Sequence, residues 1–452
     1  MEHGVREVLE GNRIEKLKDK FGGWVMKFGK LDRNAVQESY LLAKKAYAGF
    51  GVDTDAVIAQ MKDFNLSLHC WQGDDCSGFE KGDSISSGGL MATGNFPGKS
   101  KTPAQLRADI EAVIKQMPSK KSVNIHAMYS ESTDGSPVGR NDITTAHFQN
   151  WVDWANKLDI GIDFNHTFFG HEMSKSGYTL SSPDETVRAF WVKHAKLCRE
   201  IANWIGEQTG KTCANNLWIP DGSKEVPVNR SLYREQLKKS LDEIFAIKYD
   251  PKNTIDSLES KLFGIGAESF TSGSHEFYMG YAVKNNIAMT LDMGHFHQTE
   301  SVPDKLSSIF LYLDKVVFHI SRGVRWDSDH APVLGDEVLA LLQEVKRCNA
   351  FDKAVVGLDF FDPSVNRLLA WATSSRAVQK AAMIAMLEPT AMLKELEIKG
   401  QLGERLAILD ELKSMPFAAV WDKLCVESGV APGHEWIDEI NAYTDVTIAQ
   451  RS

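Results

Sequence analysis

Side chains that can bind metal ions recur between residues 257 and 362. They end a series of short apolar segments, each of which is typical of a β-strand. The residues concerned are Glu259, Asp292, His295, His319, Asp327, Asp329 and Asp359. Side chains alternate along a strand, so Thr290 and Asp292 share one face, as do Gly357 and Asp359. We therefore expect the strand ends to bring these groups together.

Five carboxylates and two imidazoles exceed the needs of one ion and suit a pair of divalent cations. Such a ligand set favours Mn, Mg or Co, with Zn as an alternative, because soft metal sites need thiolates. No cysteine lies in this stretch before Cys348. Taken singly, an Asp at a strand end is as often a turn former or helix N-cap, and His319 a core histidine. Because unpaired carboxylates would repel one another without cations, the convergence of these residues favours a metal site over the separate structural roles.

A lysine stands within this group of potential ligands. Lys261 follows Glu259 by two residues, on the same face of the expected strand. An ammonium group beside bound cations is repelled by them, so its presence there indicates a functional role. Lys261 is placed to hydrogen-bond a substrate oxygen at C1 and to offset the charge that develops there during reaction.

The elements that must position these groups alternate between strands and helices. Expected strands lie at 66–71, 123–129, 161–165 and 215–220, followed by four strands that carry the metal ligands. Expected helices begin at 102 and 182 and lie near 144–158, 230–246, 273–285, 302–313 and 335–349. Eight alternations predict an α/β fold, a (β/α)8 TIM barrel with its chemistry at the C-terminal strand ends. An open doubly wound sheet is the alternative, although no GxGxxG motif opens any unit.

Three regions follow from this pattern. We expect N-terminal helices over residues 1–60, the catalytic barrel over 61–365, and a C-terminal helical region over 366–452. The last region has a wide apolar stripe and no strand signal, which indicates packing on the barrel and on a neighbouring subunit.

The first four strands end in a different kind of side chain. These residues are His69, Trp71, His126, Asp163, Asn165, Asn216 and Trp218. A sugar offers apolar C–H faces and many hydroxyl groups, so aromatic walls interleaved with amides and imidazoles suit it. Either tryptophan alone would more often be ordinary packing. Together with a two-metal centre they indicate a carbohydrate substrate.

Composition excludes several classes of partner. The 452 residues are 43% hydrophobic and 25% charged, with a formal net charge of −10. This charge disfavours a nucleic-acid partner and adsorption to a membrane. Six scattered cysteines without a CxxC motif, and an N-terminus without a continuous apolar core, indicate a cytoplasmic protein.

Six motifs together resemble the L-rhamnose isomerase family, over essentially residues 36–446. They span residues 69–75, 218–222, 263–269, 291–297, 325–330 and 357–362. The resemblance implies a (β/α)8 barrel assembled as a homotetramer, with two divalent ions per subunit, manganese first among them. The implied reaction is the aldose–ketose interconversion of L-rhamnose and L-rhamnulose in rhamnose catabolism. Gly323 stands where this family would favour proline, which would loosen the loop that leads to Asp327.

Site residues carry over position by position. The resemblance assigns the ligands of a structural ion to Glu259, Asp292, His319 and Asp359. It assigns the ligands of a catalytic ion to His295, Asp327 and Asp329. An alternative assignment has Asp292 bridge the two ions. It makes Lys261, Asp329 and Asp359 the catalytic residues, and Trp71, His126, Trp218 and Lys261 the substrate-binding residues. Transfer of the C2 hydrogen as a hydride and transfer through an enediol both stay open.

Other functions stay open as well. An isomerase or epimerase for another aldohexose or deoxy sugar would use the same groups. A metal-dependent phosphodiesterase or nuclease on this barrel would need a basic approach surface, which the net charge of −10 does not suggest. A non-catalytic sugar-binding protein would have no use for two metals beside a lysine.

Overall fold

Eight parallel strands close into a barrel around one axis. The computed structural model describes residues 28–80, 93–136, 138–262 and 269–451. The barrel strands are β1 (Asn65–His69), β2 (Lys120–His126), β3 (Gly161–Asn165), β4 (Cys213–Trp218), β6 (Thr254–Glu259), β8 (Ala288–Asp292), β9 (Val316–Ile320) and β10 (Ala354–Leu358). Their order round the barrel is β1-β10-β9-β8-β6-β4-β3-β2, and β1 closes the circle by pairing with β10. The predicted (β/α)8 barrel is confirmed, and the open doubly wound sheet is wrong.

The strands form where apolar and polar residues alternate. In β2, Val123 and Ile125 alternate with Ser122, Asn124 and His126, and all five are buried. One face of such a strand packs on helices and the other fills the barrel. Polar residues therefore occupy part of the interior, where most barrels have Val, Ile and Leu.

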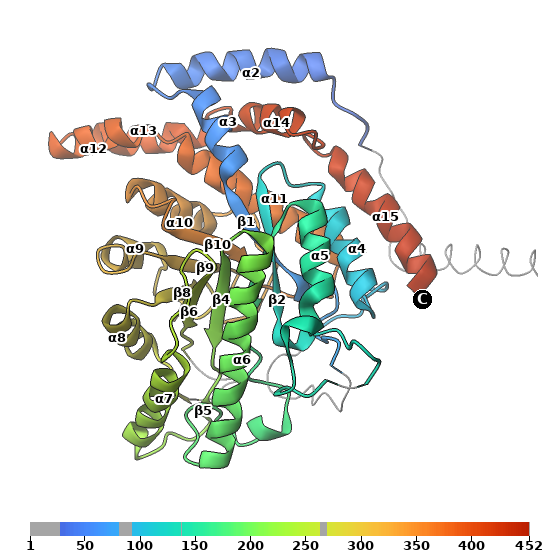
Figure 1. Cartoon of the computed structure of the whole chain (residues 1–452). Helices are drawn as coiled ribbons and strands as arrows, with labels where there is room; N and C mark the ends of the chain where they lie inside the picture. Colours follow the sequence, from blue (N-terminus) through green and yellow to red (C-terminus); the bar gives the residue numbers. More distant parts are fainter. Residues whose placement is uncertain (1–27, 81–92, 137, 263–268, 452) are drawn as a thin grey trace, which may run out of the picture.

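A helix returns the chain after each strand (Figure 1). These helices are α4 (Pro103–Ile114), α5 (Gln149–Leu158), α6 (Glu185–Thr209), α7 (Arg230–Ile244), α8 (His275–Asn285), α9 (Pro303–Ile309), α10 (Asp336–Arg347) and α11 (Arg367–Met386). α4 begins as the sequence indicates, because the Thr102 hydroxyl accepts from Gln105 N at 3.2 Å and Gln105 Oε1 accepts from Lys101 N at 2.8 Å. α10 has acidic residues in its first turn and basic residues in its last, which suits the helix dipole.

The remaining helices lie outside the alternating pattern. They are α2 (Arg33–Ala48), α3 (Thr54–Asp63), α12 (Thr390–Ile398), α13 (Leu402–Ser414), α14 (Phe417–Glu427) and α15 (Glu435–Arg451). Figure 1 shows α2, α3 and α14 gathered at the end of the barrel where α3 leads into β1, while α15 runs back along the side near α4. They leave the opposite end, where the barrel strands finish, open for a site.

The structure adds one feature, and some expectations concern residues that it does not describe. Two short strands, β5 (Gly222–Ser223) and β7 (Phe270–Thr271), form a small antiparallel sheet that the sequence did not predict. The expected helices within residues 1–27, and residues 263–268 of one family motif, lie outside the described residues. No helix in the described ranges is long and apolar enough to cross a bilayer.

Candidate metal centre and active site

Four adjacent strands deliver one cluster of metal-binding groups at the open end of the barrel. Each of Glu259, Asp292, His319 and Asp359 offers a ligand atom, and these atoms all lie within 4.8 Å of one another. The register explains the convergence, since Asp292 pairs with His319 and His319 pairs with Gly357, two residues before Asp359. Alternation along the strands thus brings these four side chains together, as expected.

A second cluster shares one residue with the first. Asp292, His295 and Asp327 also place ligand atoms within 4.8 Å of one another. His295 lies in the turn after β8, where its Nδ1 is 3.0 Å from the Ser260 carbonyl oxygen. Asp327 comes from the loop after β9. Asp292 therefore belongs to both clusters.

Glycine 294 makes the close approach of these two loops feasible. A Cβ at Gly294 would lie 2.5 Å from Asp327 Oδ1, which is closer than real contacts allow. The Gly294 N–H also donates to Asp292 Oδ1 at 2.6 Å. At Gly323, an added Cβ would lie 2.9 Å from the Trp326 carbonyl oxygen. Both glycines therefore belong to tight turns beside the second cluster.

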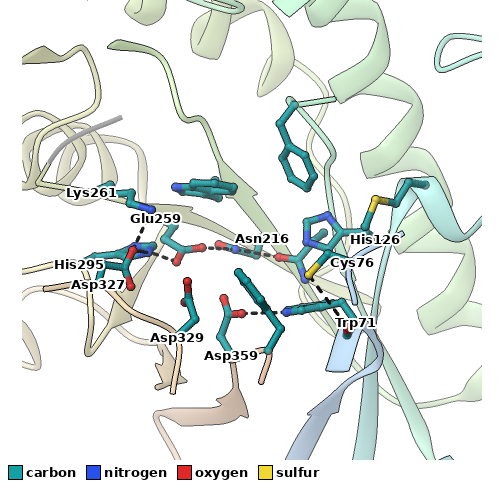
Figure 2. Close-up of a pocket in the computed structure, with 15 residues that line it drawn as sticks. Trp71, Cys76, His126, Asn216, Glu259, Lys261, His295, Asp327, Asp329 and Asp359 are labelled. Carbon is teal, nitrogen blue, oxygen red and sulfur yellow. Dashed lines mark hydrogen bonds and ion pairs between the residues drawn. The ribbon is translucent and has the colours of Figure 1, made fainter. Parts of the chain in front are cut away.

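Asp329 lies near the second cluster but outside it. It lines the same pocket and has a left-handed backbone with φ of 47°, an uncommon conformation for a residue other than glycine. Neither cluster of mutually close ligand atoms contains it. Figure 2 shows its carboxylate beside that of Asp359, facing the space below Glu259.

Carboxylates lie close together at this site and shift one another's pKa values. Burial raises the pKa of Asp292 to about 7, with His295 opposing the shift and Asp359 adding to it. Burial also raises the pKa of Asp329 well above its usual range, together with the neighbouring Asp327. For Glu259, burial would raise the pKa, but His319 and His295 outweigh it and lower the value.

Burial would lower the pKa of both imidazoles, but the carboxylates outweigh it. The pKa of His295 is raised well above its ordinary value by Asp292 and Asp327, and that of His319 by Glu259 and Asp359. Without cations, the carboxylates repel one another less when the site keeps protons on some of its carboxyl and imidazole groups.

Unsatisfied atoms show that the residues present fit divalent cations. Glu259 Oε1, Asp327 Oδ1 and His319 Nδ1 are buried and form no hydrogen bond within the described part of the chain. Buried polar atoms of this kind are rare in native proteins and call for a partner such as an ion. Carboxylate oxygens and imidazole nitrogens are ligands that Mn, Co, Mg and Zn accept.

Lys261 lies beside the second cluster, after the end of β6. Its Nζ is 2.8 Å from Asp327 Oδ2 and 4.9 Å from the ring centroid of Trp218. Burial would lower the pKa of Lys261, but Asp327 and Asp329 outweigh it and raise the value. The side chain is therefore a charged ammonium group at the pocket wall.

Aromatic residues form the other wall of the pocket (Figure 2). The Trp71 indole N–H donates to Asp359 Oδ1 at 2.9 Å, and its ring centroid lies 4.8 Å from that of His126. His126 Nδ1 is 3.0 Å from the His166 carbonyl oxygen, so Nδ1 carries the proton and Nε2 is free to accept. Burial lowers the pKa of His126 to about 4, which keeps the ring neutral. With Trp218, all of the expected substrate-binding side chains line one pocket.

Some expectations about the first strands are wrong. His69 does not line the pocket, because its Nε2 faces the Phe360 carbonyl oxygen within the core. Asp163 accepts from Ser67 Oγ at 2.5 Å and from Ala214 N at 2.8 Å, deeper in the barrel. Its position in the middle of β3 places it well before the strand end.

The pocket also contains residues that the sequence did not single out. Cys76, Met128, Phe169 and Phe361 line it. Phe361 belongs to a family motif, but nothing marked the other three, because apolar side chains in loops carry no chemical signal of their own. Phe169 lies 5.6 Å from His126 and 5.7 Å from Trp218 between ring centroids and so joins the two.

Comparison with known proteins gives a consistent result. The family model described as L-rhamnose isomerase (RhaA) matches residues 34–451. A protein of Salmonella paratyphi A named L-rhamnose isomerase is 45% identical over 417 residues, 92% of this chain and 99% of the relative. One of Yersinia pseudotuberculosis with the same name is 46% identical over 418 residues, 92% of this chain and 100% of the relative. A solved L-ribulose 3-epimerase aligns with 71% of this chain and 95% of its own at 10% identity, with a TM-score of 0.45, too low to support any conclusion.

Proposed function

Because this chain belongs to the L-rhamnose isomerase family, a family of aldose–ketose isomerases, we propose that it interconverts L-rhamnose and L-rhamnulose. The observation that carries the proposal is the pair of ligand clusters joined at Asp292, in a pocket with a charged lysine and two tryptophans.

Two divalent ions per subunit form part of the proposal, with manganese first and Zn, Co or Mg as alternatives. Glu259, Asp292, His319 and Asp359 would hold one ion, and His295, Asp327 and Asp329, with Asp292, the other. When bound, such ions stabilise negative charge on sugar oxygens. Asp329 is included because its buried carboxylate lies beside Asp327 and needs a cation to ionise.

The reaction moves a hydrogen from C2 to C1 and a proton from O2 to O1, so both oxygens pass through partial negative charge. The Lys261 ammonium, held between Asp327 and the Trp218 ring, would donate to O1 and stabilise that charge. Asp329, which would be ionised when the site holds its cations, would take the O2 proton and return it at O1. In an enediol route, Asp359, whose Oδ1 accepts from the Trp71 indole, would take the proton from C2 and return it to C1.

The aromatic wall would hold the sugar in one orientation. Trp71 and Trp218 present apolar faces that suit the C–H groups of a sugar ring or chain. His126 is neutral and has Nε2 free, so it can accept from a sugar hydroxyl.

Assembly, domain roles and location complete the proposal. We propose a homotetramer in which the C-terminal helices, residues 366–452, serve packing and assembly, residues 61–365 form the catalytic barrel, and residues 1–60 form N-terminal helices. A cytoplasmic location and a role in rhamnose catabolism are predictions from the family.

A ketose assay over a panel of aldoses, with protein stripped by EDTA and then restored with Mn²⁺, tests the activity. L-rhamnose should be the preferred substrate, and turnover should vanish on stripping and return with Mn²⁺. Preference for another sugar would support a sibling isomerase, and activity that survives stripping would contradict the metal assignment. The Asp327→Asn and Asp329→Asn double variant should be inactive with Mn²⁺ present. Full turnover in that variant would mean that the second ion is misplaced.

A further inference from the structure

A row of amide side chains crosses the barrel interior and ends on a predicted metal ligand. Asn124 of β2, Asn165 of β3 and Asn216 of β4 are each less than 5% exposed. Asn165 Nδ2 donates to Asn124 Oδ1 at 2.6 Å, and Asn216 Nδ2 donates to Asn165 Oδ1 at 2.8 Å. Asn216 Nδ2 also donates to Glu259 Oε2 at 2.5 Å, as Figure 2 shows.

The direction of every hydrogen bond in this row follows from Glu259. An ionised carboxylate only accepts, so the Asn216 atom that faces it must be the NH₂ group. The two protons of that group then serve Glu259 and Asn165, which leaves Asn165 to donate to Asn124. No amide in the row can turn over without losing at least one of these bonds.

Hydroxyl groups hold the other end of the Asn216 amide. Thr290 Oγ1 donates to Asn216 Oδ1 at 2.8 Å, and Ser257 Oγ lies 3.3 Å from the same oxygen. Thr290 and Ser257 are fully buried. Asn216 therefore has all of its polar atoms satisfied and one fixed orientation.

The consequence falls on the two oxygens of Glu259. Oε2 is held by Asn216, whereas Oε1 forms no hydrogen bond with the described residues and faces the two imidazoles, 3.4 Å from His319 Nδ1 and 3.2 Å from His295 Nδ1. Holding one oxygen fixes where the other points. Outer partners that orient a ligand in this way contribute to metal affinity.

We propose that Asn216 is a positioning residue that directs Glu259 Oε1 toward the metal ion, with Thr290 fixing the amide from behind. This inference rests on the metal centre of the proposed function. It assigns Asn216 to metal binding and to no contact with the reacting atoms.

The test compares two neighbouring asparagines on opposite faces of β4. Asn216→Leu keeps the approximate shape but removes the donor to Glu259. Asn215→Leu is the matched control, because Asn215 Nδ2 also donates to a carboxylate of β6, Asp256, at 2.8 Å, away from the metal ligands. Each protein is stripped with EDTA and titrated with Mn²⁺, and free Mn²⁺ is measured by electron paramagnetic resonance.

Asn216→Leu should weaken Mn²⁺ binding by roughly 10- to 100-fold, as loss of an outer partner typically does. Asn215→Leu should bind as the unaltered protein does, although both variants lower the melting temperature. Thr290→Val, a milder change, should weaken binding less but in the same direction, and it tests the proposal if Asn216→Leu does not fold.

The outcomes separate this inference from the proposed function. If the unaltered protein binds no Mn²⁺, the metal centre itself is wrong. If it binds Mn²⁺ but Asn216→Leu or Thr290→Val binds equally well, or Asn215→Leu loses as much affinity, the positioning role is overturned.

Discussion

At the scale of single residues, Lys261 offers the sharpest test of the chemistry. Lys261→Met keeps the length of the side chain but removes the charge beside Asp327 and Trp218. The expected loss in kcat is about 10²- to 10³-fold, as for other donors that stabilise a developing oxyanion. KM and the melting temperature with Mn²⁺ should change little, which steady-state kinetics and calorimetry would show.

Lys305→Met is the matched control. Lys305 also lies over an aromatic ring, 4.5 Å from the Phe296 centroid, and pairs with Glu300 at 2.5 Å, but it does not line the pocket. Its kcat should stay that of the unaltered protein. A Lys261→Met enzyme with normal kcat, or one that loses stability and activity together, would make Lys261 structural.

Proton binding at Asp292 predicts how metal affinity depends on pH. The folded, metal-free protein holds this carboxyl at a pKa of about 7, against 3.8 ordinarily. Its contribution to the free energy of unfolding is thus fully present below pH 4 and is lost as the pH rises through 7. An ion must displace the proton, so Mn²⁺ affinity should rise with pH, by up to about tenfold per unit for one proton.

Isothermal titration calorimetry of Mn²⁺ binding, in buffers of different ionisation enthalpy, measures the protons released. Release should be greatest near pH 6 and fall toward pH 8. Release that does not change with pH would contradict the raised pKa of Asp292.

The sequence predicts some site residues better than others for a geometric reason. Glu259, Asp292 and His319 lie on strands, where alternation alone fixes the direction of a side chain. His295 and Asp327 lie on loops, whose path depends on contacts such as that between Gly294 and Asp327. Residue spacing does not encode such contacts, and apolar pocket residues such as Phe169 cannot be foreseen at all.

At the scale of elements, the start of α11 fixes the loop that follows β1. Arg367, the first residue of α11, donates to both oxygens of Asp75, at 2.6 and 2.8 Å, and is 4% exposed. This loop carries Cys76 into the pocket next to Trp71. The salt bridge therefore connects a helix outside the active site to the pocket wall.

Arg367→Met should lower stability by about 3 kcal/mol, because it leaves a partly buried carboxylate without its partner. It should also raise KM for the sugar, since the loop that bears Trp71 and Cys76 loses its anchor. The melting temperature and steady-state kinetics measure the two effects. Lys211→Met, which removes a more exposed pair with Asp159, should change neither, and an Arg367 variant that behaves like it would contradict the role of the loop anchor.

Strand and helix identity could largely be predicted from periodicity, but element ends could not. The segment 123–129 was expected as one strand, yet β2 ends at His126 and residues Ala127–Tyr129 form a short 3-10 helix. The Tyr129 hydroxyl donates to buried Asp74 at 2.7 Å, a contact between distant segments that ends the strand for reasons outside its own sequence. The β5–β7 sheet escaped prediction because each strand has only two residues.

At the scale of the whole molecule, α13 carries exposed apolar side chains that no element in the described ranges of the chain covers. No residue of this helix is buried, and Leu402 and Leu406 are 52% and 69% exposed, with Ile398 of the preceding α12 87% exposed. Figure 1 shows α12 and α13 projecting from the barrel. If the proposed homotetramer forms, these exposed apolar side chains are where we expect one of its interfaces.

The double variant Leu402→Glu and Leu406→Glu should reduce the molar mass in solution without changing the helical signal. Light scattering after size-exclusion chromatography measures the mass, and circular dichroism the helical content. Lys413→Glu on the same helix is the control for added negative charge and should keep the mass of the unaltered protein. A monomeric unaltered protein would contradict the homotetramer, and an unchanged mass in the double variant would move the interface elsewhere.

Closure of the barrel has a consequence for how the chain folds. Leu66 of β1 pairs with Val356 of β10, so the ladder of hydrogen bonds is complete only when segments some three hundred residues apart have met. Contacts so distant in sequence slow folding, because the intervening chain must be ordered first. During synthesis, β1 must wait for almost the whole barrel to leave the ribosome. Until then its edge, and that of β9, stay available for pairing with other chains.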